Sequence, residues 1–125
     1  MATVNATINI AGAGIASIPI NINAKQGITM VGDLNIRKIT MTDASQVIAA
    51  AATYTSAWIY VKNTSSTANE HIEIGTNNAE DNSMVTVDFD LQDGEWAWFP
   101  WNSTVDLHAR RTNGSPVLEV MIFER

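Results

Sequence analysis

The sequence predicts an all-β protein, an antiparallel β-sandwich of about eight or nine strands. Residues 57–124 consist of short stretches in which apolar and polar residues alternate. Side chains on a strand point to opposite faces in turn, so this period of two indicates strands with one buried face. Polar turns separate the stretches, as in sandwiches and barrels. With 46% hydrophobic residues, the 125 residues suffice for one two-sheet core, and we expect a single domain over residues 1–125.

The first 24 residues contain no charged side chain and predict an N-terminal arm of two strands. Apolar residues recur at every second position, at Val4, Ala6, Ile8 and Ile10 and again at Ile18, Ile20 and Ile22. Gly12 and Gly14 between the two runs predict a turn. Pro19 has no N–H donor, which favours an edge position for the second strand. Because an uncharged edge strand pairs readily with another chain, we expect residues 1–24 to form an interface.

Residues 27–41 predict one or two further strands around a turn at residues 31–33. The apolar residues change parity between Ile36 and Ile39. A β-bulge at residues 37–38 would explain this switch.

Residues 42–56 are ambiguous. Helix-capping side chains followed by alanine at 49–52 favour a helix. Residues 47–48 and 53–55 are mostly β-branched and favour extended structure. We expect a short strand over residues 46–50, followed by a loop.

Six strands are expected in the second half of the chain, where the alternation is clearest. They cover residues 57–63, 71–75, 84–91, 94–99, 105–109 and 117–123. Polar loops are expected at residues 63–70 and 77–83.

Charge and composition argue against several classes of partner. Charged residues make up 16% of the chain, against about 25% in an average soluble domain, which indicates surface covered in an assembly. The net charge of −6 and only seven Lys and Arg residues argue against nucleic acid and anionic membranes. The absence of cysteine fits a reducing cytoplasm and excludes disulfides and thiolate metal sites. No apolar stretch approaches the ~20 residues of a membrane span, and the N-terminus lacks the features of a signal peptide.

The tryptophan residues are the main candidates for a binding surface. Trp96 and Trp98 share one face of their predicted strand, and Trp58 and Tyr60 share a face of an earlier strand. Aligned rings can stack on sugars, but aromatic residues more often fill cores and subunit interfaces. We therefore expect the four tryptophans to lie partly in a subunit interface, with a carbohydrate platform as the alternative. These residues are Trp58, Trp96, Trp98 and Trp101.

Few residues point to catalysis or metal binding. Four acids have the spacing D-x-D-x-x-D-x-E, at Asp88, Asp90, Asp93 and Glu95. Clustered carboxylates can hold calcium, but this segment lacks the length of an EF-hand loop, and solvent-facing acids are the simpler interpretation. His71 and His108 alternate with charged residues and are expected on the surface, and Arg110 and Arg111 are expected to form salt bridges. Because no nucleophile–base spacing is present, we predict no cofactor, no metal site and no enzymatic activity.

Three segments carry a family resemblance. Residues 58–64 read as a strand that ends in a Lys-Asn turn, and residues 91–100 follow the pattern L-x-x-G-E-x-x-x-x-P. Residues 118–124 read as a closing strand. In these features the chain resembles small β-sandwich virion proteins that tailed bacteriophages encode near their capsid genes. With the weaker alternation of residues 3–10, the resemblance covers a little over half of the chain. The tryptophan density at residues 96–101 goes beyond the family pattern.

The resemblance implies a jelly-roll-like sandwich without catalytic residues. It implies a place on the virion, as a capsid decoration or cement protein on the outer shell surface or as a minor part of the head or tail. The expected partners are the major capsid protein or other virion proteins and further copies of the chain, in a trimer or alternatively a dimer. The interface hypothesis places Val4, Ile8, Ile10, Ile18 and Ile20, together with the tryptophans, against these partners. The alternative function is a tail or fibre module that recognises host-surface carbohydrate.

Overall fold

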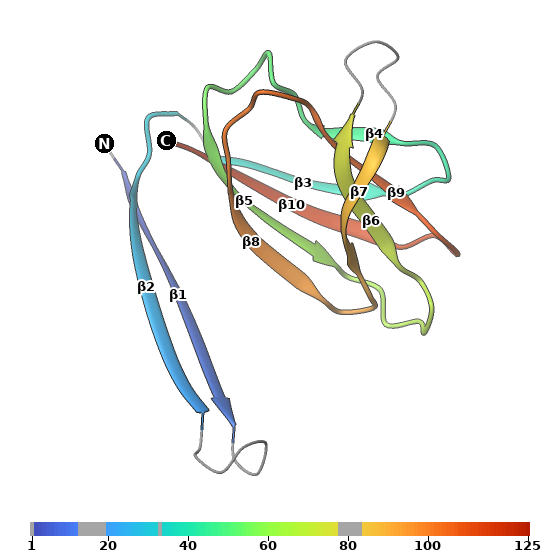
Figure 1. The fold of residues 1–125 in the computed structure, drawn as a ribbon, viewed down its shortest axis with the longest axis horizontal. Coiled ribbons are helices and arrows are strands. Elements are labelled where there is room, and N and C mark those ends of the chain that lie inside the picture. The colour runs from blue at the N-terminus through green and yellow to red at the C-terminus, as the bar shows by residue number, and fades with distance from the viewer. Residues whose placement is uncertain (1, 13–19, 33, 78–83) are drawn as a thin grey trace. The chain divides into compact units, whose positions relative to one another are not determined.

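The computed structural model describes residues 2–12, 20–32, 34–77 and 84–125, and the regular secondary structure in these ranges is all β-strand. The chain divides into two compact units, an N-terminal unit that ends at Val31 and a larger unit from Gly32 to Glu124 (Figure 1). The N-terminal unit therefore extends beyond the expected arm of residues 1–24. None of the described residues belongs to a helix long and apolar enough to cross a membrane.

The N-terminal unit is a two-stranded antiparallel hairpin. Strand β1 (Thr3–Gly12) pairs with β2 (Ile20–Thr29) over ten residues, from Thr3 opposite Thr29 to Gly12 opposite Ile20, without a shift in register. The two strands predicted here are confirmed. Gly14, Ile18 and Pro19, on which the predicted turn and edge position depended, lie outside the described residues.

The larger unit is a β-sandwich of two four-stranded antiparallel sheets, ordered β3-β10-β5-β8 and β4-β9-β6-β7 (Figure 1). Its strands are β3 (Leu34–Thr40), β4 (Gln46–Ala49), β5 (Ala57–Asn63), β6 (Ile72–Asn77), β7 (Met84–Leu91), β8 (Trp96–Trp101), β9 (Leu107–Arg111) and β10 (Val117–Glu124). Apart from β6 and β7, consecutive strands lie in different sheets, and this order is that of a jelly roll. The predicted antiparallel sandwich is confirmed, including the six strands of the second half and the short strand β4.

The core lies between the two sheets and follows from the period of two. Along β5 the odd-numbered residues are buried and the even-numbered ones are half-buried, and in β10 the even-numbered ones point inward. Inward side chains of the two sheets form one continuous hydrophobic cluster. The cluster is built around Ile48, Ile59, Val61, Ile72, Ile74, Leu107, Leu118, Val120 and Ile122.

Strand β3 corrects one prediction. Its register with β10 runs from Thr40 opposite Val117 to Leu34 opposite Phe123 without a shift, so the bulge expected at residues 37–38 is wrong. The apolar residues change parity because both faces of β3 carry them, with Ile36 exposed and Ile39 packed against the core.

A buried asparagine fixes the connections at one end of the sandwich. The Asn63 side-chain amide donates to the carbonyl of Glu70 at 2.6 Å and to that of Leu91 at 3.1 Å, and its Oδ1 accepts from the Ser65 N–H at 3.0 Å. The Asn63 backbone N–H donates to the carbonyl of Glu95 at 2.9 Å. Both polar atoms of this buried side chain have hydrogen-bond partners, so these bonds offset the free-energy cost of removing them from water. Asn63 can therefore hold the segments around Ser65, Glu70 and Leu91 together.

The opposite roles of neighbouring residues in β10 give a test of the fold. Ile122 is fully buried opposite Ile59, so Ile122→Ala is expected to lower the free energy of unfolding by about 2–5 kcal/mol through lost burial and a cavity. Met121 points to the other face, and Met121→Ala is expected to cost less than about 1 kcal/mol. Urea denaturation at low protein concentration measures both. Equal losses would contradict the assignment of the two faces.

Candidate functional site

The outer face of the sheet β3-β10-β5-β8 is apolar and aromatic. The strand register aligns its outward side chains in rows across the four strands. One row contains Leu34, Phe123, Trp58 and Pro100, and the next contains Ile36, Met121, Tyr60 and Trp98. A third row contains Lys38, Glu119, Lys62 and Trp96. We call the apolar members of these rows the aromatic face.

The rings on the aromatic face pack against one another. Trp58 and Trp98 are stacked, with ring centroids 5.4 Å apart and planes 11° from parallel. Phe123 meets Trp98 edge-on at 5.2 Å, and Tyr60 lies 6.3 Å from Trp96. Such pairs contribute about 0.5–1.5 kcal/mol each beyond their area, so the face is a preorganised surface.

The aromatic face is unusual because an outward face of an antiparallel sheet is normally polar. Ile36 is 56% exposed and Trp96 is 53% exposed. Desolvation, and then the negative charge of Glu119, raise the pKa of the Tyr60 phenol above its ordinary value. Its charged neighbours are confined to the third row. Phe123 is buried and the rings of Trp58, Tyr60 and Trp98 are half-buried, so the exposed part of the face consists mainly of Leu34, Ile36 and Trp96. An exposed apolar patch marks an interaction surface.

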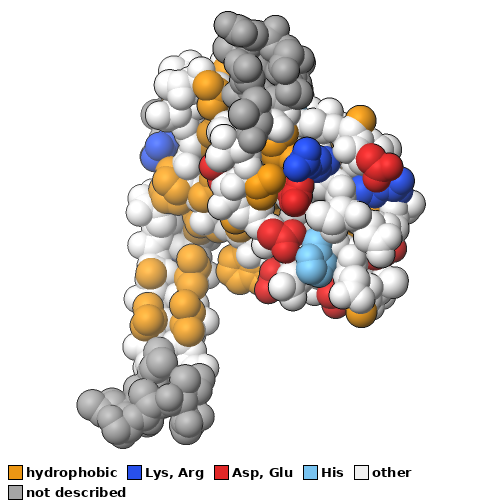
Figure 2. All heavy atoms as spheres, turned by 45° about the vertical axis from the view of Figure 1, so that its right-hand side comes forward, with side chains coloured by type: hydrophobic (Ala, Val, Ile, Leu, Met, Phe, Trp, Pro, Cys, Tyr) orange, Lys and Arg blue, Asp and Glu red, His pale blue; other side chains and the backbone are white. Residues whose placement is uncertain are grey.

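A second apolar surface lies on the hairpin. Its even-numbered residues share one face, and the odd-numbered residues, mainly Thr and Asn, share the other. We call the first set the hairpin apolar face; it consists of Val4, Ala6, Ile8, Ile10, Ile22, Ala24 and Ile28 with Gln26. Ile10 and Ile22 form a cross-strand pair and are 52% and 51% exposed. Figure 2 shows the hydrophobic side chains following one another along the hairpin.

The outer edge of β1 offers main-chain hydrogen-bonding groups. The Met30 N–H donates to the Ala2 carbonyl at 3.0 Å, which makes this a hydrogen-bonded pair. Hydrogen-bonded and non-hydrogen-bonded pairs alternate along an antiparallel ladder, so the N–H and C=O groups of odd-numbered residues in β1 point away from β2. In the described sheets β1 pairs with β2 alone, and β1 carries no charge to protect this edge.

The structure brings together most of the predicted interface residues, but in two separate sets. Val4, Ile8 and Ile10 lie on the hairpin apolar face, and Trp58, Trp96 and Trp98 lie on the aromatic face. Ile20 pairs with Gly12 through the backbone, and Ile18 lies outside the described residues.

Trp101 corrects the predicted set. It has the parity of Phe99 and points into the core, where it is 7% exposed and meets Tyr54 edge-on at 6.3 Å. It is therefore not available to an interface on the aromatic face. Sequence reasoning missed Leu34, Ile36 and Met121 as members of this face. Leu34 and Ile36 lie in β3 and Met121 lies in β10, which is distant from β3 in sequence. The alternation within each strand showed which residues share a face, but not that the two strands lie side by side.

His108 also corrects a prediction, because it is fully buried and not on the surface. It lies in β9 between β4 and β6, and the Ser45 hydroxyl lies 2.8 Å from its Nδ1. Its Nε2 is buried without a partner in the described part of the chain. The Asp106 carboxylate accepts from the Ala51 N–H at 2.7 Å. In a Ser-His-Asp triad the carboxylate orients Nδ1 and the serine meets Nε2, so this arrangement is not a triad.

The remaining polar candidates do not converge on one point in the described part of the chain. His71 is half-buried, with Nδ1 3.2 Å from the Asp90 carboxylate, and Glu95 accepts from the Gln92 N–H at 2.9 Å in a turn. No group of three or more His, Asp or Glu side chains converges within residues 2–12, 20–32, 34–77 and 84–125. The four acids at residues 88–95 therefore give the calcium interpretation no support.

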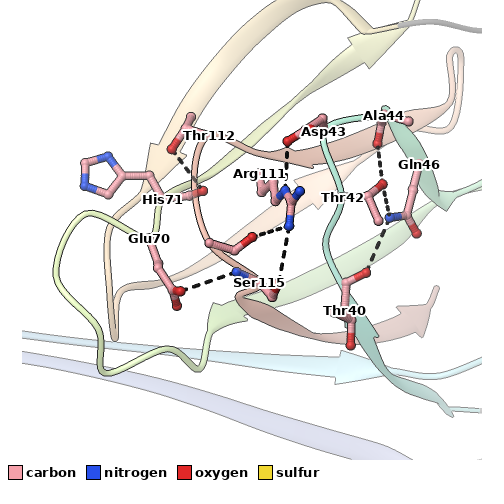
Figure 3. Close-up of polar contacts among 11 residues, drawn as sticks. Thr40, Thr42, Asp43, Ala44, Gln46, Glu70, His71, Arg111, Thr112 and Ser115 are labelled. Carbon is pink, nitrogen blue, oxygen red and sulfur yellow. Dashed lines mark hydrogen bonds and ion pairs between the residues drawn. The ribbon is translucent and has the colours of Figure 1, made fainter.

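The salt bridges expected for the arginine pair are confirmed. Arg110 lies 2.6 Å from Glu73, and Arg111 lies 2.8 Å from Asp43. The Arg111 guanidinium also donates to the Ser115 hydroxyl at 3.2 Å, as Figure 3 shows. The hydrogen bond and the charge of Arg111 lower the pKa of Asp43. Arg111, Asp43 and Ser115 tie the connections before β4 and after β9 together.

Comparisons of the sequence with protein-family models, with curated proteins and with solved structures give no match. The functional argument therefore depends on the two apolar surfaces and the open edge of β1.

The buried histidine predicts a pH dependence of stability. Burial lowers the pKa of His108, and the charge of Asp106 opposes this shift to a smaller extent. Because the folded pKa is below the unfolded value of about 6.5, the unfolded chain binds more protons as the pH falls. Stability is therefore highest above about pH 6.5 and is lost as the pH falls through that value toward the folded pKa.

Urea midpoints at about pH 5 and pH 7.5, on either side of the unfolded pKa, measure this loss. His108→Gln is expected to remove part of it, because the buried imidazole is the group that must be protonated on unfolding. A His108→Gln protein that loses as much stability as the wild type on acidification would contradict the assignment.

Proposed function

We propose that the chain is a non-enzymatic structural protein of a virion, which binds the outer surface of a capsid shell and stabilises it. The observation that carries the proposal is the hairpin: β1 has no charged residue, and among the described strands it pairs with β2 alone, which leaves a row of main-chain donors and acceptors along its other edge. Such an edge binds proteins by strand addition, in which main-chain hydrogen bonds give affinity. The partner in this proposal is the major capsid protein, and the location is the virion surface.

Two further features support a structural role. The jelly roll is rigid scaffold, because its inward side chains form one core and its polar side chains are used in pairs that tie connections together. The low charge and the aromatic face provide apolar area for contact with other proteins. The three segments that resemble phage virion proteins point in the same direction.

A second candidate function is recognition of host-surface carbohydrate by a tail or fibre module. The observation in its favour is Trp96, whose half-exposed ring lies beside Tyr60. Stacking of Trp58 on Trp98 weighs against it, because each ring covers one face of the other. The polar side chains near Trp96 are Lys38, Glu119 and Lys62 of the same row, and the rest of the face is apolar. Retention of the protein on a polysaccharide column, without binding to shells, would favour this function.

The strand-addition mechanism predicts an effect of proline at Thr7, an odd-numbered residue whose N–H points to the open edge. Thr7→Pro removes that donor and is tolerated at an edge facing away from the partner strand. The dissociation constant for shell binding is expected to rise about 10-fold, which corresponds to the free energy of about one lost hydrogen bond. Thr7→Val keeps the N–H and the β-branched shape and is the matched control.

The measurement is co-sedimentation with shells assembled from the major capsid protein of the same genome, together with the heat resistance of those shells. Wild type and Thr7→Val are expected to bind and to raise the temperature at which the shells rupture. A wild-type protein that does not bind shells would exclude the proposed function. Equal binding of the proline and valine variants would exclude strand addition at this edge.

A further inference from the structure

We infer that the hairpin apolar face of one copy packs on the aromatic face of a neighbouring copy, and that copies exchange hairpins in this way to form a closed homo-oligomer. The inference deepens the proposed function, because it assigns the contacts between copies and not the contact with the shell. It is therefore tested on the isolated protein.

Each copy brings both halves of this contact. The hairpin apolar face consists of aliphatic side chains on a two-stranded ribbon, and Ile10 and Ile22 remain about half exposed. The aromatic face is a sheet surface with Ile36 and Trp96 about half exposed. Two β-surfaces of this kind pack face to face at about 10 Å, as the two sheets of a sandwich do. A set of identical copies can thus cover both surfaces without another protein.

Charge permits this contact although the chain has a net charge of −6. The hairpin has one charged residue, Lys25, and its odd number places it on the polar face. The aromatic face has one acidic neighbour, Glu119, which lies between Lys38 and Lys62 in register. The acidic residues that give the net charge therefore lie mostly outside the two contact surfaces, and their repulsion is screened over about 8–10 Å.

The buried area distinguishes a single hairpin-on-sheet contact between two copies from a reciprocal exchange in which each copy both gives and receives a hairpin. Within one copy Ile28, at the base of the hairpin apolar face, is already buried, so about eight residues of each strand remain free. A ribbon of this length is about 26 Å long and about 10 Å wide, and its face covers on the order of 260 Å². One hairpin on one sheet therefore buries about 500 Å² in total, which is in the range of crystal contacts. Two reciprocal contacts bury about 1,000 Å² in total, which reaches the lower limit of specific interfaces, and a ring of three buries more in total. The exchange must therefore close.

The exchange leaves the strand-addition edge free. Thr7 lies on the polar face of the hairpin, and its main-chain groups point sideways from β1. A closed oligomer would present several such edges, and several weak contacts with a shell would add through high effective concentration.

The first test alters the hairpin without altering its pairing. The double variant Ile10→Glu with Ile22→Lys changes one cross-strand pair of the hairpin apolar face. The control Asn9→Glu with Asn23→Lys changes the adjacent pair on the polar face. Both variants introduce the same charges, and opposite charges directly across a ladder are favourable. The first is expected to raise the dissociation constant of the oligomer at least ~100-fold through the lost apolar area, and the control is expected to leave it unchanged.

The second test alters the receiving sheet. Ile36→Glu with Met121→Lys changes one cross-strand pair of the aromatic face, and Thr40→Glu with Val117→Lys is its control at the end of the same two strands. Sedimentation equilibrium over a range of concentrations measures the oligomer, and circular dichroism confirms that each variant is folded. The emission of the half-exposed Trp96 is expected to shift to shorter wavelength as wild-type copies associate.

The inference would be overturned if the wild-type protein stays monomeric in sedimentation equilibrium up to a concentration of about 10⁻⁴ M. Dissociation by the hairpin variant alone would show that ribbons pack on ribbons, and dissociation by the sheet variant alone would show that sheets pack on sheets. Either result would also overturn it. Thr7→Pro is expected to remain oligomeric while its shell binding weakens by about 10-fold, so failure of the inference and failure of the proposed function are distinguishable.

Discussion

The sandwich depends on burial of the inward side chains of β5 and β10 between the two sheets. These strands are the central pair of their sheet, and their inward residues are fully buried. Burying each Ile, Val or Leu side chain contributes about 1.5–3 kcal/mol, so the core fixes which way every strand of the sheet faces. Because side chains alternate, the same constraint also fixes which residues point outward. In this sheet most of the outward residues are apolar as well, apart from the row of Lys38, Glu119 and Lys62.

The sheet β3-β10-β5-β8 carries apolar residues on both of its faces, and this property connects the fold to the proposed role. A monomer whose outer sheet face carries Trp96, Ile36 and their neighbours exposes a surface that water does not favour, and the amphipathic hairpin exposes another. The low content of charged residues is consistent with both surfaces being covered in an assembly. In the arrangement we infer, the apolar surfaces hold copies together, and the hydrogen-bonding edge of β1 remains for a different partner.

The corrected predictions share one cause. Alternation shows which residues of a strand lie on the same face, but it does not show what covers that face. Trp101 was grouped with Trp96 and Trp98 by composition, although its parity places it in the core. His108 follows the alternation of its charged neighbours, yet it lies on a central strand with Ser45 against its ring. The change of parity in β3 reflects two apolar faces and not a bulge.

The sequence by itself determined the class of the fold, the strands of its second half, the amphipathic N-terminal hairpin and the faces shared within each strand. These features are local, because they follow from backbone geometry and from the spacing of apolar residues. Only the tertiary structure decided the jelly-roll order, which places β3 beside β10 and β10 beside β5. That order joins Leu34 and Ile36 to Met121 and the tryptophans in one surface. Contacts between strands distant in the chain depend on how all the strands pack together, and no short stretch of sequence contains that information.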